Sequence, residues 1–126
     1  MEGLEFTSFT DTEKQKLEDL LKSGNAVGYD PGNFFGYCSY REIKEPSYLS
    51  RKFDEYQPRI YGCTYNYSIK YNNEVVGFLA IWNGVSPFGE DQLPDIDFWF
   101  IDTAKVNPEE AKKSIFTKLQ KDFLGE

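Results

Sequence analysis

The sequence predicts an α+β fold for residues 1–126, in which an antiparallel β-sheet is packed by an N-terminal and a C-terminal helix. Three observations support this prediction: a central hairpin pattern over residues 60–82, a further strand pattern over residues 95–102, and a helix-start signal near each end. A chain of 126 residues is close to the commonest domain size and buries enough surface for one core without disulfides. We therefore expect a single domain.

The N-terminal helix is expected to begin after Thr10. Residues 4–9 alternate briefly between apolar and polar, and Thr10 and Glu13 have the spacing of a capping box. The chain then places three leucines on one helical face, and Gly24 supplies a left-handed stop. These leucines are Leu17, Leu20 and Leu21.

A turn, a strand and a second helix are expected next. The run 28–33 is typical of a turn, because its Pro fixes one dihedral angle while its Gly and Asn residues tolerate positive φ. Aromatic residues make 34–40 a candidate strand, although Gly36 weakens it. Pro46 favours the start of a short helix that ends before Pro58.

The clearest strand covers residues 60–71, where aromatic and apolar side chains alternate strictly with small or polar ones. Asn72 and Asn73 both tolerate positive φ, so a tight turn should return the chain as an antiparallel strand over residues 75–82. That run is apolar on both faces, which indicates a central strand covered on two sides.

A third strand is expected over residues 95–102, after a loop over residues 83–94. Its alternation places Ile96, Phe98 and Phe100 on one face and Asp95, Asp97, Trp99 and Ile101 on the other. Asn107 as a cap, with Pro108 at the first helical position, predicts the C-terminal helix. Its buried stripe is expected to contain Ala111, Ile115, Leu119 and Phe123.

The distribution of charge is the most informative feature for function. The formal net charge is −7, and the stretch 72–104 contains six acidic residues and no Lys or Arg. Clustered carboxylates repel one another, so a stretch that keeps them among large aromatic residues is suited to a cationic partner. The alternative is that these acids only keep an aromatic-rich chain in solution. The six are Glu74, Glu90, Asp91, Asp95, Asp97 and Asp102.

The composition excludes several functional classes. The chain has no histidine, which is the commonest general base, so Ser-His-Asp and Cys-His catalytic arrangements are excluded. Cys38 and Cys63 are expected to be reduced and structural rather than part of a disulfide framework or a zinc site. A net charge of −7 opposes direct nucleic-acid binding, which depends on Lys and Arg.

The chain also lacks a phosphate-binding loop, and we expect no resident cofactor and no metal. No apolar run approaches the roughly 18 residues that cross a bilayer, and residues 1–13 do not resemble a signal segment. We therefore expect no membrane association and a cytoplasmic location.

Two chemistries that need only carboxylates stay open as alternatives. Asp95 and Asp97 share a strand face, which is compatible with an acid pair or a binding site for a sugar, since aromatic residues commonly stack on sugar rings. Together with Glu90 and Asp91 they offer several oxygen ligands for calcium, although the regular calcium-loop spacing is missing. A small carbohydrate-binding or ligand-binding domain is therefore one alternative.

The other alternative comes from a resemblance. Residues 106–116 resemble the strand-to-helix segment of the acetyl-CoA-dependent N-acetyltransferase family, and residues 73–79 resemble the strand before it. In that family, an Arg or Gln followed by glycines exposes backbone amides to the cofactor pyrophosphate. Ala111, Ser114 and Phe116 stand in those places here, and their side chains would fill the space that the pyrophosphate needs. The resemblance implies a degenerate or truncated scaffold without the activity.

The function predicted from the sequence is that of a non-enzymatic, acidic inhibitor that neutralises a basic toxin or enzyme, as immunity proteins and antitoxins do. Its carboxylates would occupy the phosphate subsites of a nucleic-acid-targeting active site, and aromatic side chains would supply the desolvated centre. Trp99 is the expected aromatic anchor, because it shares a strand face with two of the acids. The candidate partner-binding residues are Phe88, Glu90, Asp91, Asp95, Asp97 and Trp99.

Overall fold

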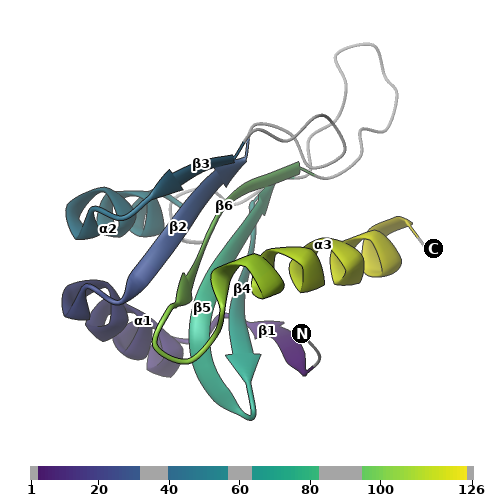
Figure 1. The fold of residues 1–126 in the computed structure, drawn as a ribbon. Helices are drawn as coiled ribbons and strands as arrows, with labels where there is room; N and C mark the ends of the chain where they lie inside the picture. Colours follow the sequence, from purple (N-terminus) through teal and green to yellow (C-terminus); the bar gives the residue numbers. More distant parts are fainter. Residues whose placement is uncertain (1–2, 32–39, 57–63, 83–94, 125–126) are drawn as a thin grey trace.

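The computed structural model describes residues 3–31, 40–56, 64–82 and 95–124, which form a six-stranded antiparallel sheet and three helices (Figure 1). The α+β prediction is therefore confirmed. In chain order the elements are β1 (Leu4–Ser8), α1 (Asp11–Ser23), β2 (Ala26–Pro31), β3 (Tyr40–Ile43), α2 (Pro46–Glu55), β4 (Thr64–Tyr71), β5 (Glu74–Trp82), β6 (Asp95–Asp102) and α3 (Pro108–Leu124). Across the sheet the order is β1-β4-β5-β6-β2-β3, so β1 and β3 are the edges.

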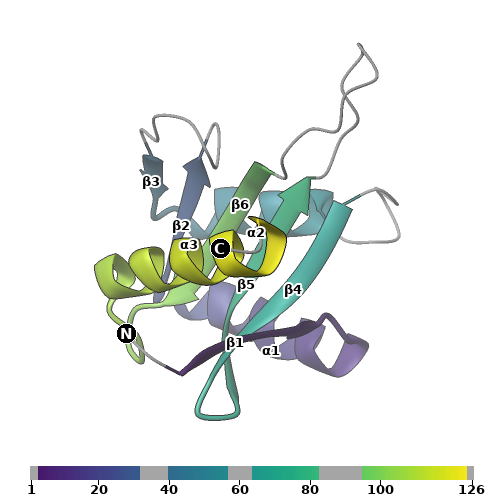
Figure 2. The same cartoon turned by 90° about the vertical axis from the view of Figure 1, so that its right-hand side faces the viewer.

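Helices cover both faces of this sheet. Figure 2 shows α3 in front of the strands and α1 and α2 behind them, in agreement with Figure 1. Under α3, Ala111 and Ile115 pack with side chains of the four central strands and β1, including Trp99 and Ile101. On the opposite face, side chains of α1 and α2 pack on three phenylalanines of β5 and β6. The phenylalanines are Phe78, Phe98 and Phe100.

The first helix begins and ends where the local signals predict. The Thr10 hydroxyl accepts a hydrogen bond from the Glu13 backbone amide at 3.3 Å, and the Thr10 amide donates to Glu13 Oε1 at 3.2 Å. This reciprocal pair is the expected capping box. Gly24 ends the helix with a φ of 78°, a left-handed conformation that glycine adopts without strain.

The predicted hairpin is present. Asn72 and Asn73 have φ values of 53° and 65° and connect β4 to β5. Of the predicted first strand, residues 64–71 form β4, and residues 60–63 lie outside the described part of the chain. The third strand, β6, has the predicted bounds.

The third helix also begins as predicted. The Asn107 side chain accepts hydrogen bonds from the backbone amides of Glu109 and Glu110, at 3.0 and 3.1 Å. Ala111 and Ile115 are fully buried, as expected. The side chains of the other two stripe residues, Leu119 and Phe123, lie outside the described part.

The turn predicted for residues 28–33 is wrong over residues 28–31, because the chain continues as strand β2 to Pro31, and residues 32–33 lie outside the described part of the chain. Gly28 is needed for close packing between α2 and the sheet, and it does not form a turn. A Cβ atom at this position would overlap Leu49 Cδ2 of α2 and lie 3.2 Å from Phe98 Cε2. The missing side chain therefore lets α2 approach the sheet closely. Of the candidate strand 34–40, only Tyr40 is described, as the first residue of β3.

Candidate functional site

The acidic stretch 72–104 runs through the centre of the sheet. It contains β5 and β6, which pair with each other from Gly77 opposite Ile101 to Trp82 opposite Asp95. Because β6 has eight residues, its two ends lie roughly 24 Å apart at 3.4 Å per residue. The acids that β5 and β6 carry are therefore divided between two opposite ends of the sheet.

At one end, the acids already have partners within the chain. Lys105 Nζ lies 3.0 Å from Glu74 Oε2, and the carboxylate of Glu74 raises the pKa of Lys105. Asp102 is buried, with 8% of its surface exposed, and its Oδ1 accepts a hydrogen bond from the Ala104 amide at 2.9 Å. These two acids stabilise the turn between β6 and α3, so they do not belong to the predicted partner site.

Of the four remaining acids, the structure places the backbone of two at the opposite end of the sheet. Asp95 and Asp97 lie in the first half of β6, where Asp95 pairs in register with Trp82 at the end of β5. Their side chains lie outside the described part of the chain, as do residues Phe88, Glu90 and Asp91. The structure therefore places the backbone of Asp95 and Asp97 in β6. Phe88, Glu90 and Asp91 remain predicted site residues.

The expectation that Trp99 is an exposed aromatic anchor is wrong. Its side chain is 0% exposed and stacks on Tyr29, with ring centroids 4.4 Å apart and an interplanar angle of 21°. The alternation along β6 correctly separates Trp99 from Phe98 and Phe100, but α3 covers the face that Trp99 occupies. Trp99 is a core residue in this structure.

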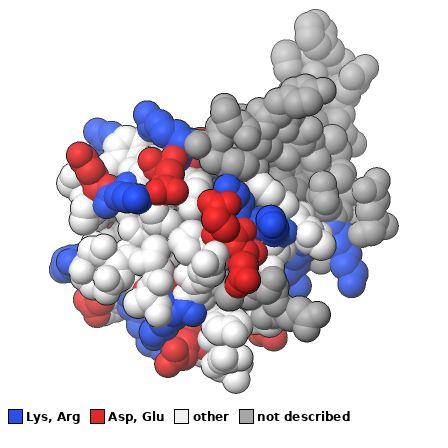
Figure 3. Space-filling view, viewed as in Figure 1, with Lys and Arg blue, Asp and Glu red and all other residues white. Residues whose placement is uncertain are grey.

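The surface of the described residues is otherwise mixed in charge. On the face seen in Figure 3, acidic and basic side chains alternate in small groups. The described residues also form ion pairs that are exposed or partly exposed, such as Lys112 with Glu109 at 3.1 Å and Lys44 with Glu42 at 3.2 Å. Exposed pairs of this kind contribute little to stability.

A buried polar cluster between α1 and β4 was not predicted from the sequence. Glu13 accepts a hydrogen bond from the Ser68 hydroxyl at 2.9 Å, and Lys70 Nζ lies 2.8 Å from its second oxygen. Glu13 and Ser68 are both buried. The signal in the sequence is the polar face of β4, which carries Ser68 and Lys70 where an apolar face would be expected under a helix. This cluster ties the start of α1 to the sheet.

Stability should depend on the ionisation of Glu13. Burial raises the pKa of Glu13, but hydrogen bonds from Lys70, Ser68 and Thr10 and the charge of Lys70 together hold it below its ordinary value of 4.5. Because the pKa of Glu13 is lower in the folded protein than in the unfolded chain, its ionised carboxylate stabilises the fold above pH 4.5. This contribution is lost as the pH falls through the folded-state pKa. We expect Glu13→Gln to lower the free energy of unfolding by about 2 kcal/mol at pH 7.

Urea titrations of wild type and Glu13→Gln at pH 7 and pH 3 measure this effect. The difference between the two proteins should shrink at pH 3, because below pH 4.5 the unfolded chain binds a proton at Glu13 and the advantage of the ionised carboxylate in the folded protein falls. The control is Glu18→Gln, because Glu18 forms a partly exposed pair with Lys14 at 3.9 Å and should change stability by less than about 0.5 kcal/mol. A pH-independent difference for Glu13→Gln would contradict a role for its charge.

The start of α3 does not fit the pyrophosphate cradle of an acetyl-CoA-dependent N-acetyltransferase. The Asn107 side chain already occupies the backbone amides of Glu109 and Glu110. Ala111 is fully buried in the core, and Phe116 packs against that core. A pyrophosphate binds free amides at a helix start, and these two are not free.

Within the described ranges, no three acidic or cysteine side chains gather as a metal-binding group, and none of the three helices is long and apolar enough to span a membrane. Of the calcium set considered above, Glu90 and Asp91 lie outside these ranges, and the side chains of Asp95 and Asp97 are not described. Comparison of the chain with protein-family models, with curated proteins and with solved structures finds no match in any of the three.

Proposed function

We propose that this protein is a non-enzymatic, acidic inhibitor that binds a basic protein in the cytoplasm, in the manner of an immunity protein or antitoxin. The observation that supports this most directly is the stretch 72–104, which has six acids and no Lys or Arg. A surface with this charge attracts cationic partners and repels nucleic acid and other acidic proteins. A basic, nucleic-acid-targeting toxin or enzyme is the partner class that fits it.

The distribution of the acids over the fold sharpens the proposal. Glu74 and Asp102 are engaged by Lys105 and by the Ala104 amide, at the end of the sheet where α3 begins. The proposed site uses the other four acids, Glu90, Asp91, Asp95 and Asp97, with Phe88 as the aromatic contact. Trp99 is removed from the proposed site because it is buried.

The strand pairing supports treating these acids as one group. Trp82 and Asp95 face each other across the paired ends of β5 and β6. Segment 83–94, which carries Phe88, Glu90 and Asp91, joins those two ends in the sequence. All four acids therefore belong to residues within or directly after this connection.

The test is a charge-reversed variant with Lys at Glu90, Asp91, Asp95 and Asp97. A matched control places Lys at four other exposed acids, so that both variants change the net charge equally. The control positions are Glu5, Asp11, Asp19 and Glu110. Tagged wild type and both variants are used to capture partners from the native host, and the captured protein is then purified for binding measurements at low and high salt.

We expect wild type and control to bind the same basic protein, and the charge-reversed variant to lose affinity by on the order of 100-fold. Reversal at Glu90 and Asp91 alone should mainly slow association and flatten its salt dependence, since charges at the rim of an interface steer the encounter. If the four reversals leave both affinity and salt dependence unchanged, the acids only keep the chain in solution and the inhibitor proposal fails.

A further inference from the structure

Strand β3 forms an open edge of the sheet. It pairs with β2 on its inner side, and no strand of the sheet follows it on the outer side in the described part of the chain. Figure 2 shows β3 at this side of the sheet, with α2 behind the strands. A groove of about 260 Å³ follows the edge, and it is lined by residues 41–45 and by Tyr48 of α2. The edge is therefore accessible along five consecutive residues.

The backbone along this edge directs the hydrogen-bonding groups of alternate residues outward. The Thr103 amide donates to the Asn25 carbonyl at 2.8 Å, so the odd-numbered residues of β2 point towards β6 and the even-numbered ones towards β3. These even-numbered residues pair with odd-numbered residues of β3. The N–H and C=O groups of Glu42 and Lys44 therefore point away from the sheet. The backbone is still extended at Glu45, with a φ of −73° and a ψ of 118°.

The charges along this edge are complementary to themselves. Residues 41–45 read Arg-Glu-Ile-Lys-Glu, and only the central isoleucine is buried. In an antiparallel pairing of two copies centred on this isoleucine, Glu42 would lie opposite Lys44 of the second copy. Arg41 would lie opposite Glu45 of the second copy. Each contact occurs twice by symmetry, and opposite charges directly across two strands stabilise their pairing.

The contacts of Glu42 and Lys44 within one chain are compatible with this pairing. Lys44 Nζ lies 3.2 Å from Glu42 Oε1 on the same strand face. Burial and the charge of Glu42 raise the pKa of the Tyr29 hydroxyl to about 12. A carboxylate accepts about four hydrogen bonds, so Glu42 can keep both neighbours and meet a second lysine. The four side chains of two copies would then alternate in sign around a square.

Arg41 and Glu45 are also able to pair across the edge. Arg41 Nη2 lies 3.3 Å from Asp30 Oδ2 and donates to the Tyr48 hydroxyl. The other N–H groups of Arg41 have no hydrogen-bond partner, and Glu45 forms no ion pair, among the described residues. Residues 32–39, which precede β3 and lie outside the described part, carry no charge. A carboxylate from a second copy would therefore meet guanidinium N–H groups that are not yet used.

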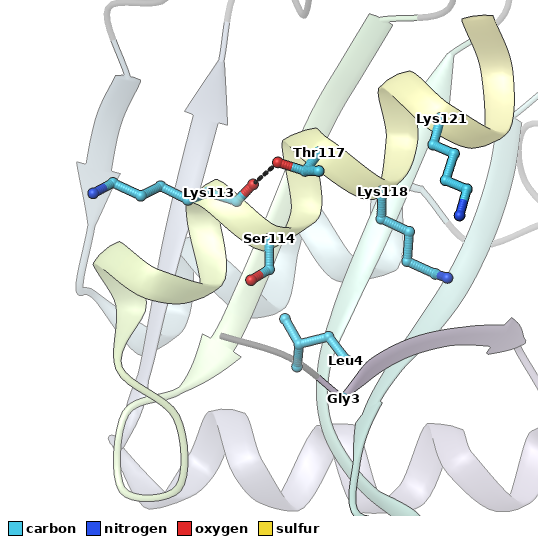
Figure 4. Close-up of a pocket in the computed structure, with 7 residues that line it drawn as sticks. All are labelled: Gly3, Leu4, Lys113, Ser114, Thr117, Lys118 and Lys121. Atoms are coloured by element: carbon cyan, nitrogen blue, oxygen red, sulfur yellow. Dashed lines mark hydrogen bonds between the residues drawn. The ribbon is translucent and has the colours of Figure 1, made fainter. Parts of the chain in front are cut away.

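Other registers and the other sheet edge lack this complementarity. A shift by two residues, the smallest that keeps the side chains on their faces, places Glu42 opposite Glu42 or Lys44 opposite Lys44, which is destabilising. At the other edge, β1 carries a single charged residue, Glu5, so self-pairing gives it no partner of opposite sign on the strand. There α3 lies beside the start of the strand, across a groove bounded by Gly3 and Leu4 (Figure 4).

We propose that two copies of this chain associate through β3, antiparallel about Ile43, and so form one continuous sheet across a two-fold axis. The pairing satisfies the outward backbone groups that an edge strand otherwise exposes, and the same residues serve on both sides of the interface. Because only five residues of each copy pair, we expect a reversible dimer rather than an obligate one. The proposal is independent of the inhibitor function, since none of the acids assigned to partner binding lies in β3.

Sedimentation velocity over a range of protein concentrations measures this association. We expect wild type to shift from monomer to dimer as the concentration rises. Glu42→Lys and Lys44→Glu each place like charges opposite one another, so each variant alone should self-associate at least about tenfold more weakly. An equimolar mixture of the two variants restores opposite charges at both contacts. The mixture should therefore form a heterodimer about as tightly as wild type forms its dimer.

The matched controls are Glu110→Lys and Lys16→Glu, which make the same changes of charge at exposed positions outside β3. Both should dimerise as wild type does, and circular dichroism should show every variant folded. Hydrogen exchange followed by NMR gives a second readout, because the amides of Glu42 and Lys44 should be protected only in the dimer.

Three results would each overturn the proposal. The first is a wild-type protein that stays monomeric up to about 500 μM. The second is a dimer that both β3 variants keep, or in which the amides of Glu42 and Lys44 stay unprotected. The third is a mixture of the two β3 variants that stays monomeric.

Discussion

Replacing Gly77 by alanine is expected to destabilise the protein by about 3 kcal/mol or more, at the upper end of what overpacking costs. Gly77 lies in β5, between Ile69 of β4 and Ile101 of β6. A Cβ atom there would overlap the Phe100 carbonyl oxygen and lie 3.2 Å from Ile101 Cα. Both contacts are with backbone atoms, so relief requires β5 and β6 to move apart in the middle of the sheet. Urea or guanidinium titration measures the loss.

Gly28→Ala is the matched control, since Gly28 is also a buried strand glycine. Its Cβ would overlap Leu49 Cδ2, which is the tip of a flexible side chain. Rotation of that side chain relieves most of the overlap, so the expected cost is about 1 to 2 kcal/mol. An equal or smaller loss for Gly77→Ala would show that the strands adjust as easily as a side chain does, and would contradict the close pairing of β5 and β6.

These two glycines also show what the sequence could not predict about the fold. Helix α1, the β4–β5 hairpin and the start of α3 follow from short-range chemistry: a capping box at Thr10, positive φ at Asn72 and Asn73, and the Asn107 cap. Gly28 looks like a turn residue because its neighbours include Pro and Gly. Its actual role depends on which helix packs against β2, and that contact is between residues distant in the sequence.

The candidate site also depends on contacts between residues that are distant in the sequence. The charge of the stretch 72–104 is visible in the sequence, and so is the alternation along β6. Whether either face of β6 meets solvent is not visible, because it depends on where the helices dock. The two aspartates made the face that contains Trp99 look exposed, whereas α3 covers Trp99. The buried cluster of Glu13, Ser68 and Lys70 was missed for the same reason.

Trp99→Ala is expected to lower the free energy of unfolding by about 3 to 5 kcal/mol, the usual cost of truncating a buried aromatic residue to alanine. The indole is 0% exposed and stacks on Tyr29, which lies in the neighbouring strand β2. Its removal opens a cavity under α3 and leaves one face of the Tyr29 ring without a partner. Denaturant titration checks the size of the loss.

Trp99→Phe separates this structural role from a role in binding. Phenylalanine keeps an aromatic ring beside Tyr29, and it removes an indole N–H that is buried without a hydrogen-bond partner in the described structure. The expected cost is therefore only about 1 kcal/mol, as for other near-isosteric core changes. Because Trp99 is buried, Trp99→Phe should dissociate from a basic partner at the wild-type rate under conditions where both proteins are folded. Faster dissociation of this folded variant would show that Trp99 contacts the partner directly, and that α3 moves away from β6 in the complex.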